Sequence, residues 1–219
     1  MPHYTASEKS AQIEVTEANV QLDGTKTVLL VGVGGQGTIL AGSLLAMAAA
    51  QAGLDVKVSE IHGMSQRGGS VSTVVRMGEH VDTMVCDPGC ADAIVSFEAV
   101  EALRAQQYLR EGGHLFVNDE TIVPVSVSIG TFSMPGDVSA RLDGLGAVRV
   151  SAGEIARQVG SPRSTNVVLV GALSTALPFS PETWEDVISR RVPPKTVEAN
   201  IKAFRAGRAA AGASDVEGA

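Results

Sequence analysis

A buried strand that leads through a glycine turn into an apolar helix constrains the fold of this chain more than any other feature. Thr27–Val33 (TVLLVGV) is a continuous apolar run, as in strands that are covered on both faces. The turn Gly34–Gly37 (GGQG) follows, and Thr38–Ala52 is rich in alanine and leucine and stops at Gly53. Leu54–Glu60 alternates apolar and polar residues and predicts a second strand. This order of elements opens the doubly wound α/β sheets.

The rest of the chain predicts a mixed sheet. Ser70–Met77 and His80–Val85 flank Gly78-Glu79, and two strands around a tight turn are typical of an antiparallel hairpin. We therefore expect a three-layer α/β/α, Rossmann-like domain at residues 25–208, with a β-hairpin in its sheet, an N-terminal arm at 1–24 and a disordered tail at 209–219. Further strands are expected at Ala91–Phe97, His114–Asn118, Thr121–Ile129 and Ala147–Val150, and helices at Glu98–Glu111, Ser151–Val159, Thr165–Leu177, Pro181–Arg191 and Pro193–Ala211.

Composition and charge exclude several classes of protein. The chain has 219 residues, enough for one domain with a substantial core. Its formal net charge of −7 and the lack of basic stretches with interleaved aromatics argue against a nucleic-acid partner. The longest apolar runs, Ile39–Ala50 and Val167–Leu177, are shorter than the roughly 18 residues of a membrane span. The first residues also lack the apolar centre of a secretory signal, so we expect a cytoplasmic protein.

The only two cysteines, Cys86 and Cys90, lie in the short stretch CDPGC. Structural zinc sites and iron–sulfur clusters normally take four ligands. We expect these residues to be reduced thiols in a turn and the chain to hold no metal.

The glycine turn has the spacing of a dinucleotide site. Gly32, Gly34 and Gly37 match the pattern G-x-G-x-x-G between a strand and a helix, where backbone N–H groups can meet a pyrophosphate. Glu60 ends the second strand, where an acidic residue could hold a ribose hydroxyl. An NAD(P)- or flavin-binding Rossmann protein that acts alone is therefore one alternative. In another, the glycines bind nothing and only allow the helix to pack closely on the strand.

The segment after the second strand does not fit a plain dinucleotide site, because the polar stretch HGMSQRGGS stands where a helix would begin. Arg67 could hold an anion with its bidentate fork, or it could form a salt bridge to Glu60 or Asp87 that only folds the segment. No residue is assigned a catalytic role. The candidates for a ligand site or for the mouth of an active site are Gly34, Gly35, Gln36, Gly37, Glu60, His62, Ser65, Gln66, Arg67, Gly68, Gly69 and Ser70.

These stretches together resemble a known family. The chain resembles the γ-type domain of the 2-oxoacid:ferredoxin oxidoreductases, and is most similar to the indolepyruvate-type members. The similar stretches are VGVGGQG, SEIHGMSQRGGSV, ADAIVSFEAVEALR and VEANIKAFRAG. The resemblance extends from Thr27 to Gly207.

The resemblance implies a division of labour between subunits. Enzymes of this family decarboxylate a 2-oxoacid with thiamine diphosphate and magnesium, transfer the acyl group to coenzyme A, and pass electrons through iron–sulfur clusters to ferredoxin. It implies that a large catalytic α subunit carries these cofactors, and that this chain binds none alone and helps to form the coenzyme A region. Arg67 would then meet a coenzyme A phosphate, or a carboxylate at the mouth of the partner's active site.

Overall fold

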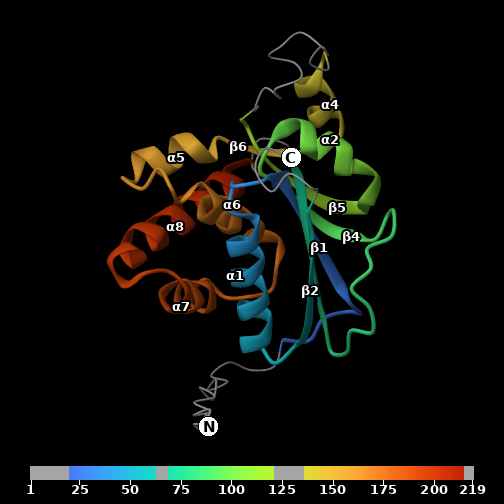
Figure 1. Cartoon of the computed structure of the whole chain (residues 1–219), viewed down its shortest axis with the longest axis horizontal. Helices are drawn as coiled ribbons and strands as arrows, with labels where there is room; N and C mark the ends of the chain where they lie inside the picture. Colours follow the sequence, from blue (N-terminus) through green and yellow to red (C-terminus); the bar gives the residue numbers. More distant parts are fainter. Residues whose placement is uncertain (1–19, 63–68, 121–135, 215–219) are drawn as a thin grey trace, which may run out of the picture.

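The computed structural model describes residues 20–62, 69–120 and 136–214. Its centre is a six-stranded sheet with the order β2-β3-β1-β4-β5-β6 (Figure 1). The strands are β1 (Lys26–Val33), β2 (Asp55–His62), β3 (Ser70–Gly78), β4 (Ala91–Ser96), β5 (Leu109–Asn118) and β6 (Val148–Val150). The carboxyl ends of β1, β4, β5 and β6 meet at one edge, because each of these strands is parallel to the next.

The predicted mixed sheet is confirmed, but its antiparallel strand has different partners from those predicted. β3 runs antiparallel to both β1 and β2. Residues 80–85 form no strand, so the predicted hairpin around Gly78-Glu79 is wrong. The antiparallel neighbours in sequence are β2 and β3, which are joined through residues 63–69.

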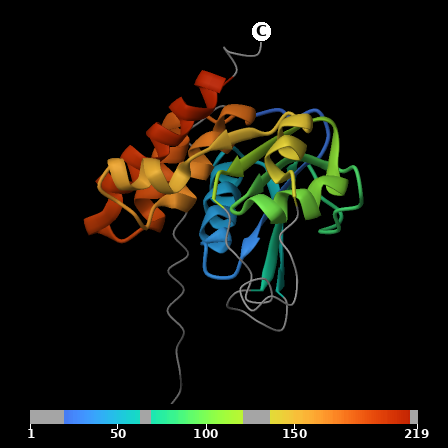
Figure 2. The same ribbon diagram turned by 90° about the horizontal axis from the view of Figure 1, so that it is seen from above.

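One face of the sheet carries most of the helices. α1 (Thr38–Gln51) packs on β1, β2 and β3, α6 (Thr165–Leu173) on β4 and β5, and α8 (Val197–Ser214) on β6. α7 (Pro181–Arg191) packs on α1 and α8, and α5 (Ala152–Gln158) on α6 and α8. Figure 2 shows the orange and red helices gathered on one side of the molecule.

The other face has a smaller cover. α2 (Ala99–Ala105) packs on β1, β4 and β5, and α4 (Val138–Gly144) packs against α2. Helices on both faces confirm the predicted α/β class. Short 3₁₀ turns, η1 (Gln106–Tyr108), η2 (Ser174–Ala176) and η3 (Pro194–Thr196), follow α2, follow α6 and precede α8.

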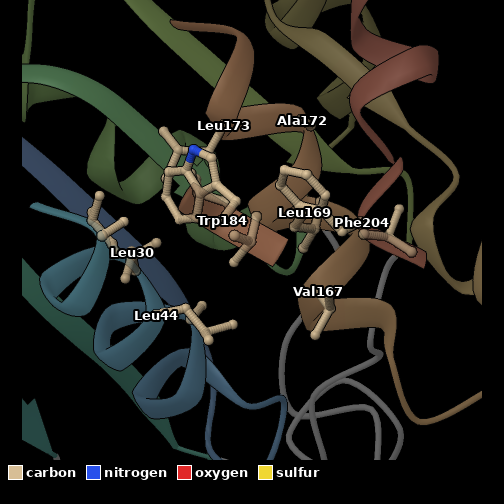
Figure 3. Packing of buried hydrophobic residues seen from close by; sticks show 14 of the residues in the cluster. Leu30, Leu44, Val167, Leu169, Ala172, Leu173, Trp184 and Phe204 are labelled. Carbon is tan, nitrogen blue, oxygen red and sulfur yellow. The ribbon is translucent and has the colours of Figure 1, made fainter. Parts of the chain in front are cut away.

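The core on the first face depends on close helix contact as well as bulky side chains. Leu30, Leu44, Trp184 and Phe204 are fully buried there (Figure 3). The backbones of α6 and α8 touch through two glycines. A Cβ at Gly171 would lie 2.1 Å from the carbonyl oxygen of Phe204, and one at Gly207 would lie 1.9 Å from that of Val168.

Several predicted boundaries are corrected. The helix expected at 98–111 ends as an α-helix at Ala105, because β5 begins at Leu109. α4 lies where a loop was expected, and α8 extends to Ser214, so the disordered tail does not begin at 209. Val20 and Leu22, from the predicted arm, pack against the core. The strand expected at 121–129 lies outside the described residues. No helix in the described ranges combines the length and the apolar character needed to cross a membrane.

Candidate functional site

The glycine turn at the end of β1 needs glycine for two reasons. Gly37, the N-cap of α1, has a φ of 89°, which is favourable only for residues without a Cβ. A Cβ there would also lie 2.5 Å from Nδ2 of Asn166, at the start of α6. At Gly32 the reason is space alone, since a Cβ would lie 2.7 Å from Oε1 of Gln36 and 2.9 Å from Cβ of Phe97. The turn is therefore closely surrounded by β4 and α6.

Two amide side chains bind the carboxyl ends of three strands together. Oε1 of Gln36 accepts a hydrogen bond of 2.7 Å from the N–H of Val33, and its Nε2 donates to the carbonyl of Phe97 at 3.0 Å. Nδ2 of Asn118, at the end of β5, donates to the same carbonyl at 3.2 Å. Gln36 thus uses both ends of its amide within the fold, and the groups left to face a ligand are backbone and neighbouring side chains.

A crevice of about 620 Å³ opens beside this network. It lies at the carboxyl ends of β1 and β4, which send their next helices to opposite faces of the sheet, and such a position is where α/β folds bind ligands. Arg163 is exposed at its rim and makes no ion pair among the described residues. The N-terminus of α1 has no side-chain cap, so its N–H groups and Arg163 together favour an anion. The lining residues are Gly35, Gln36, Gly37, Leu40, Phe97, Asn118, Glu120, Pro162, Arg163, Thr165 and Asn166.

Glu60 does not lie where a dinucleotide site would need it. In a Rossmann unit the first two strands are neighbours, but here β3 lies between β1 and β2. At about 4.8 Å per strand, the end of β2 is displaced roughly 10 Å from the glycine turn along the sheet. Glu60 also does not line the crevice. Glu60 therefore cannot be the acidic partner that the fingerprint requires.

The far end of the polar segment does reach the glycine turn. The N–H of Gly34 donates to the carbonyl of Gly69 at 2.9 Å. Next to it, the Ser70 hydroxyl donates to Oε2 of Glu101 at 2.5 Å, and Glu101 forms an ion pair of 3.0 Å with Arg104.

His62 ends β2, where its backbone pairs with Val71. Four residues of the predicted set fall outside the described ranges, and their roles stay predictions: Ser65, Gln66, Arg67 and Gly68.

Comparison with known proteins gives the family. Residues 27–210 match the family described as pyruvate ferredoxin/flavodoxin oxidoreductase. The chain belongs to this family. It is 44% identical over 191 residues to indolepyruvate oxidoreductase subunit IorB of Thermococcus kodakarensis, which covers 84% of this chain and 95% of that relative. It is 31% identical to 2-oxoglutarate synthase subunit KorC of Methanothermobacter marburgensis, over 84% of this chain and 95% of the relative.

A solved structure agrees. The γ subunit of a keto/oxoacid ferredoxin oxidoreductase from Geobacter sulfurreducens superimposes with a TM-score of 0.63 at 29% identity, over 86% of this chain and 99% of that one. The family resemblance and the γ-type fold predicted from the sequence are confirmed.

A second hollow in this family member, on the α2 face, was not predicted. It is a groove of about 420 Å³ over β1, β2 and β3, bounded by α2 and by residues 84–86. Arg76 fixes that boundary, because its Nη1 donates to the carbonyls of Thr83 and Val85 at 3.1 and 3.0 Å. Three large apolar side chains in the groove stay 49–61% exposed: Ile61, Met84 and Val85. Accessible apolar patches of this kind are typical of contact sites.

Sequence reasoning missed the distant half of the crevice. Asn118, Arg163 and Asn166 come from β5 and from the start of α6, and no local motif joins them to the glycine turn. The available signal was the polar run Ser161–Asn166 directly before an apolar helix, which is typical of a helix start that faces a site. In the ranges that the structure describes, no group of three or more His, Cys, Asp or Glu could hold a metal ion.

Proposed function

We propose that this chain is an accessory subunit of a thiamine diphosphate-dependent 2-oxoacid:ferredoxin oxidoreductase that acts on arylpyruvates such as indolepyruvate. Its partner is a large catalytic subunit that carries the thiamine diphosphate, magnesium and iron–sulfur clusters. The observation that carries the proposal is the 44% identity to an IorB subunit over 95% of that protein's length. The lower identity to KorC, 31%, favours the arylpyruvate over 2-oxoglutarate as the substrate.

The crevice gives this subunit a role in the complex. Coenzyme A carries phosphates, and the uncapped N-terminus of α1 and Arg163 both favour an anion. We propose that the crevice contributes to the coenzyme A region and that the Arg67 segment faces the partner's active site. The carbonyl of Gly69 accepts a hydrogen bond from the N–H of Gly34, and this contact connects that segment to the glycine turn beside the crevice.

The first experiment tests the complex. The chain is expressed with and without a large subunit of the indolepyruvate oxidoreductase type, and ferredoxin reduction is measured with coenzyme A and either indolepyruvate or 2-oxoglutarate. We expect stable co-purification and a reaction that requires both chains and prefers indolepyruvate. A large subunit that reaches full turnover without this chain would refute the accessory role, and a preference for 2-oxoglutarate would refute the substrate.

The second experiment tests the crevice within the assembled enzyme. Arg163→Ala should raise the KM for coenzyme A about ten- to a hundred-fold, because a hydrogen bond to a charged group contributes roughly 1.5–3 kcal/mol. Arg157→Ala is the matched control, since Arg157 lies nearby on α5 but pairs with Glu154 and does not line the crevice. If both variants raised the KM for coenzyme A equally, the crevice would not be part of the coenzyme A region.

Arg67 is tested in the same assay. Arg67→Ala should lower turnover by a similar factor, and Arg67→Lys should restore little, because an ammonium group cannot reproduce the bidentate guanidinium fork. Arg67→Ala could instead lower the melting temperature of the isolated chain while the assembled enzyme keeps full activity at a permissive temperature. Arg67 would then be a structural salt-bridge partner.

The alternative is a nucleotide-binding protein that acts alone. The position of β3 between β1 and β2 argues against it, because the end of β2 is then too far from the glycine turn. We expect calorimetry of the isolated chain with NAD, NADP and FAD to show weak binding or none. A micromolar dissociation constant for any of them would favour this alternative.

A further inference from the structure

The two cysteines lie together at the end of the segment that joins β3 to β4. The stretch Asp87-Pro88-Gly89-Cys90 forms a turn in which the N–H of Cys90 donates to the carbonyl of Asp87 at 3.2 Å. Gly89 has a φ of 74°, and proline followed by a left-handed glycine is the signature of a type II turn. Such a turn reverses the chain and returns Cys90 to the side of Cys86.

The turn is also fixed from outside. The N–H of Gly89 donates to the carbonyl of Gln107 at 2.9 Å, which ties the turn to η1. Within it the two Sγ atoms are 2.8 Å apart. A disulfide bond measures about 2.05 Å, so a small side-chain adjustment would be enough to join them.

Small reactants can reach this pair. Both thiols are free and partly exposed, and Cys86 lines the groove on the α2 face. We propose that Cys86 and Cys90 form a reversible redox site, which a small disulfide such as oxidised glutathione converts into an intramolecular disulfide. This inference does not rest on the proposed function.

The reaction balances as two thiol–disulfide exchanges. One cysteine thiolate attacks a sulfur of oxidised glutathione, which forms a mixed disulfide and releases one glutathione thiolate that takes up a proton. The second cysteine, as its thiolate, attacks the protein sulfur of that mixed disulfide and releases the second glutathione. The two protein thiols lose two electrons and two protons, and the oxidised glutathione becomes two molecules of reduced glutathione.

The surroundings of Cys86 set the order of the two steps. Burial is the main cause, and the hydrogen bond with Cys90 the next, that raises the pKa of the Cys86 thiol to about 12. Cys86 therefore holds its proton more firmly than an ordinary thiol, and we expect it to be the second rather than the first nucleophile. Once Cys90 is in a mixed disulfide, its sulfur lies beside Cys86, so the second attack takes place within the chain and is favoured by proximity.

The experiment uses the full chain without a partner, so its outcome is independent of the enzyme assay. The purified chain is equilibrated in glutathione buffers of increasing oxidised fraction, quenched with an alkylating agent and mapped by peptide mass spectrometry. We expect one species that has lost two hydrogen atoms, carries a link from Cys86 to Cys90 and returns to the dithiol with reduced glutathione. A chain that stays a dithiol, or carries two glutathiones, or links to a second chain would overturn the proposal.

Single variants test the order of attack. Cys86→Ser should gain one glutathione on Cys90 quickly, and Cys90→Ser should gain one on Cys86 at least about tenfold more slowly at neutral pH, since the thiolate is the nucleophile. Equal rates would overturn the assignment of Cys90 as the first nucleophile. Neither variant should form an intramolecular link.

Discussion

The two faces of the sheet differ in how fully helices cover them. On the α1 face, α1, α6 and α8 pack on all six strands, and Trp184 and Phe204 fill the space between the helices. On the α2 face, α2 packs on β1, β4 and β5 and α4 packs against α2, each with seven residues, and an open groove lies over β1, β2 and β3. The comparison indicates that the first face supplies most of the stability, whereas the second keeps apolar surface accessible.

The largest expected effect is at Trp184. This side chain is fully buried, and its ring meets the edge of Phe179 at 5.9 Å between centroids and lies 6.1 Å from Phe204. Trp184→Ala should lower the free energy of unfolding by about 3–5 kcal/mol, as expected for a large aromatic in a packed core. Urea unfolding followed by circular dichroism measures this.

Two controls sharpen the comparison of the faces. Trp184→Phe should cost much less, because it keeps an aromatic ring and removes an indole N–H that is buried with no hydrogen-bond partner in the part of the chain that the structure describes. Val85→Ala, in the groove, should change stability by less than about 0.5 kcal/mol, as usual for exposed positions. A loss at Val85 as large as that at Trp184 would contradict the division between the faces.

The next effect concerns the backbone contact of α6 with α8. Gly207→Ala places a methyl group against the Val168 carbonyl, and overpacking of this kind costs about 1–3 kcal/mol. Gly212→Ala in the same helix is the matched control, since no atom of the described residues lies within 4 Å of its added Cβ. There the better helix propensity of alanine should add up to about 1 kcal/mol. If both variants change stability in the same direction, close helix contact does not explain Gly207.

These regions also differ in how well the sequence predicts them. On the α1 side the elements were predicted closely: β1, α1 and α7 lie within one residue of their expected bounds. On the α2 face the alternating pattern of residues 80–85 wrongly predicted a strand. Hydrogen bonds with side chains hold the backbone of this segment, in place of backbone pairing with a neighbouring strand. Asp55 accepts a hydrogen bond from the N–H of Val81, and Lys57 and Arg76 donate to carbonyls of the segment.

The candidate site was predictable only in its local half. The glycine turn has a fixed spacing and stands directly before a helix, so the sequence alone located it. Asn166 contacts Gly37 from 129 residues away, through packing of α6 beside α1. Contacts of this range depend on the tertiary fold and leave no local pattern.

A smaller effect is expected at the edge where the faces meet. Gln36→Ala leaves the Val33 N–H without its acceptor and should cost about 1–2 kcal/mol, the lower part of the range for an unsatisfied group. Gln36→Glu keeps that acceptor, but its carboxylate has no proton to donate to the Phe97 carbonyl. Relative to the wild type, this variant should therefore recover stability as the pH falls below about 4.3, where the carboxyl group gains a proton. An unchanged difference between pH 7 and pH 4 would mean that the bond to Phe97 contributes nothing.

The last comparison tests the α2 face through pH. Burial and the hydrogen bond with Cys90 raise the pKa of the Cys86 thiol from 9.0 to about 12 in the folded chain. Between these two values the unfolded chain carries a thiolate while the folded chain keeps the proton, so this contribution is complete below pH 9.0 and is lost as the pH rises towards about 12. Cys86→Ser removes the titrating group. The stability advantage of the wild type over Cys86→Ser, measured by urea unfolding with a reductant present, should therefore shrink above pH 9.0, whereas the difference between wild type and Trp184→Phe should stay constant. If the difference between wild type and Cys86→Ser also stays constant, the Cys86 thiol is as exposed in the folded chain as in the unfolded one. The rim of the groove would then be more open to solvent than the exposed fractions of its residues indicate.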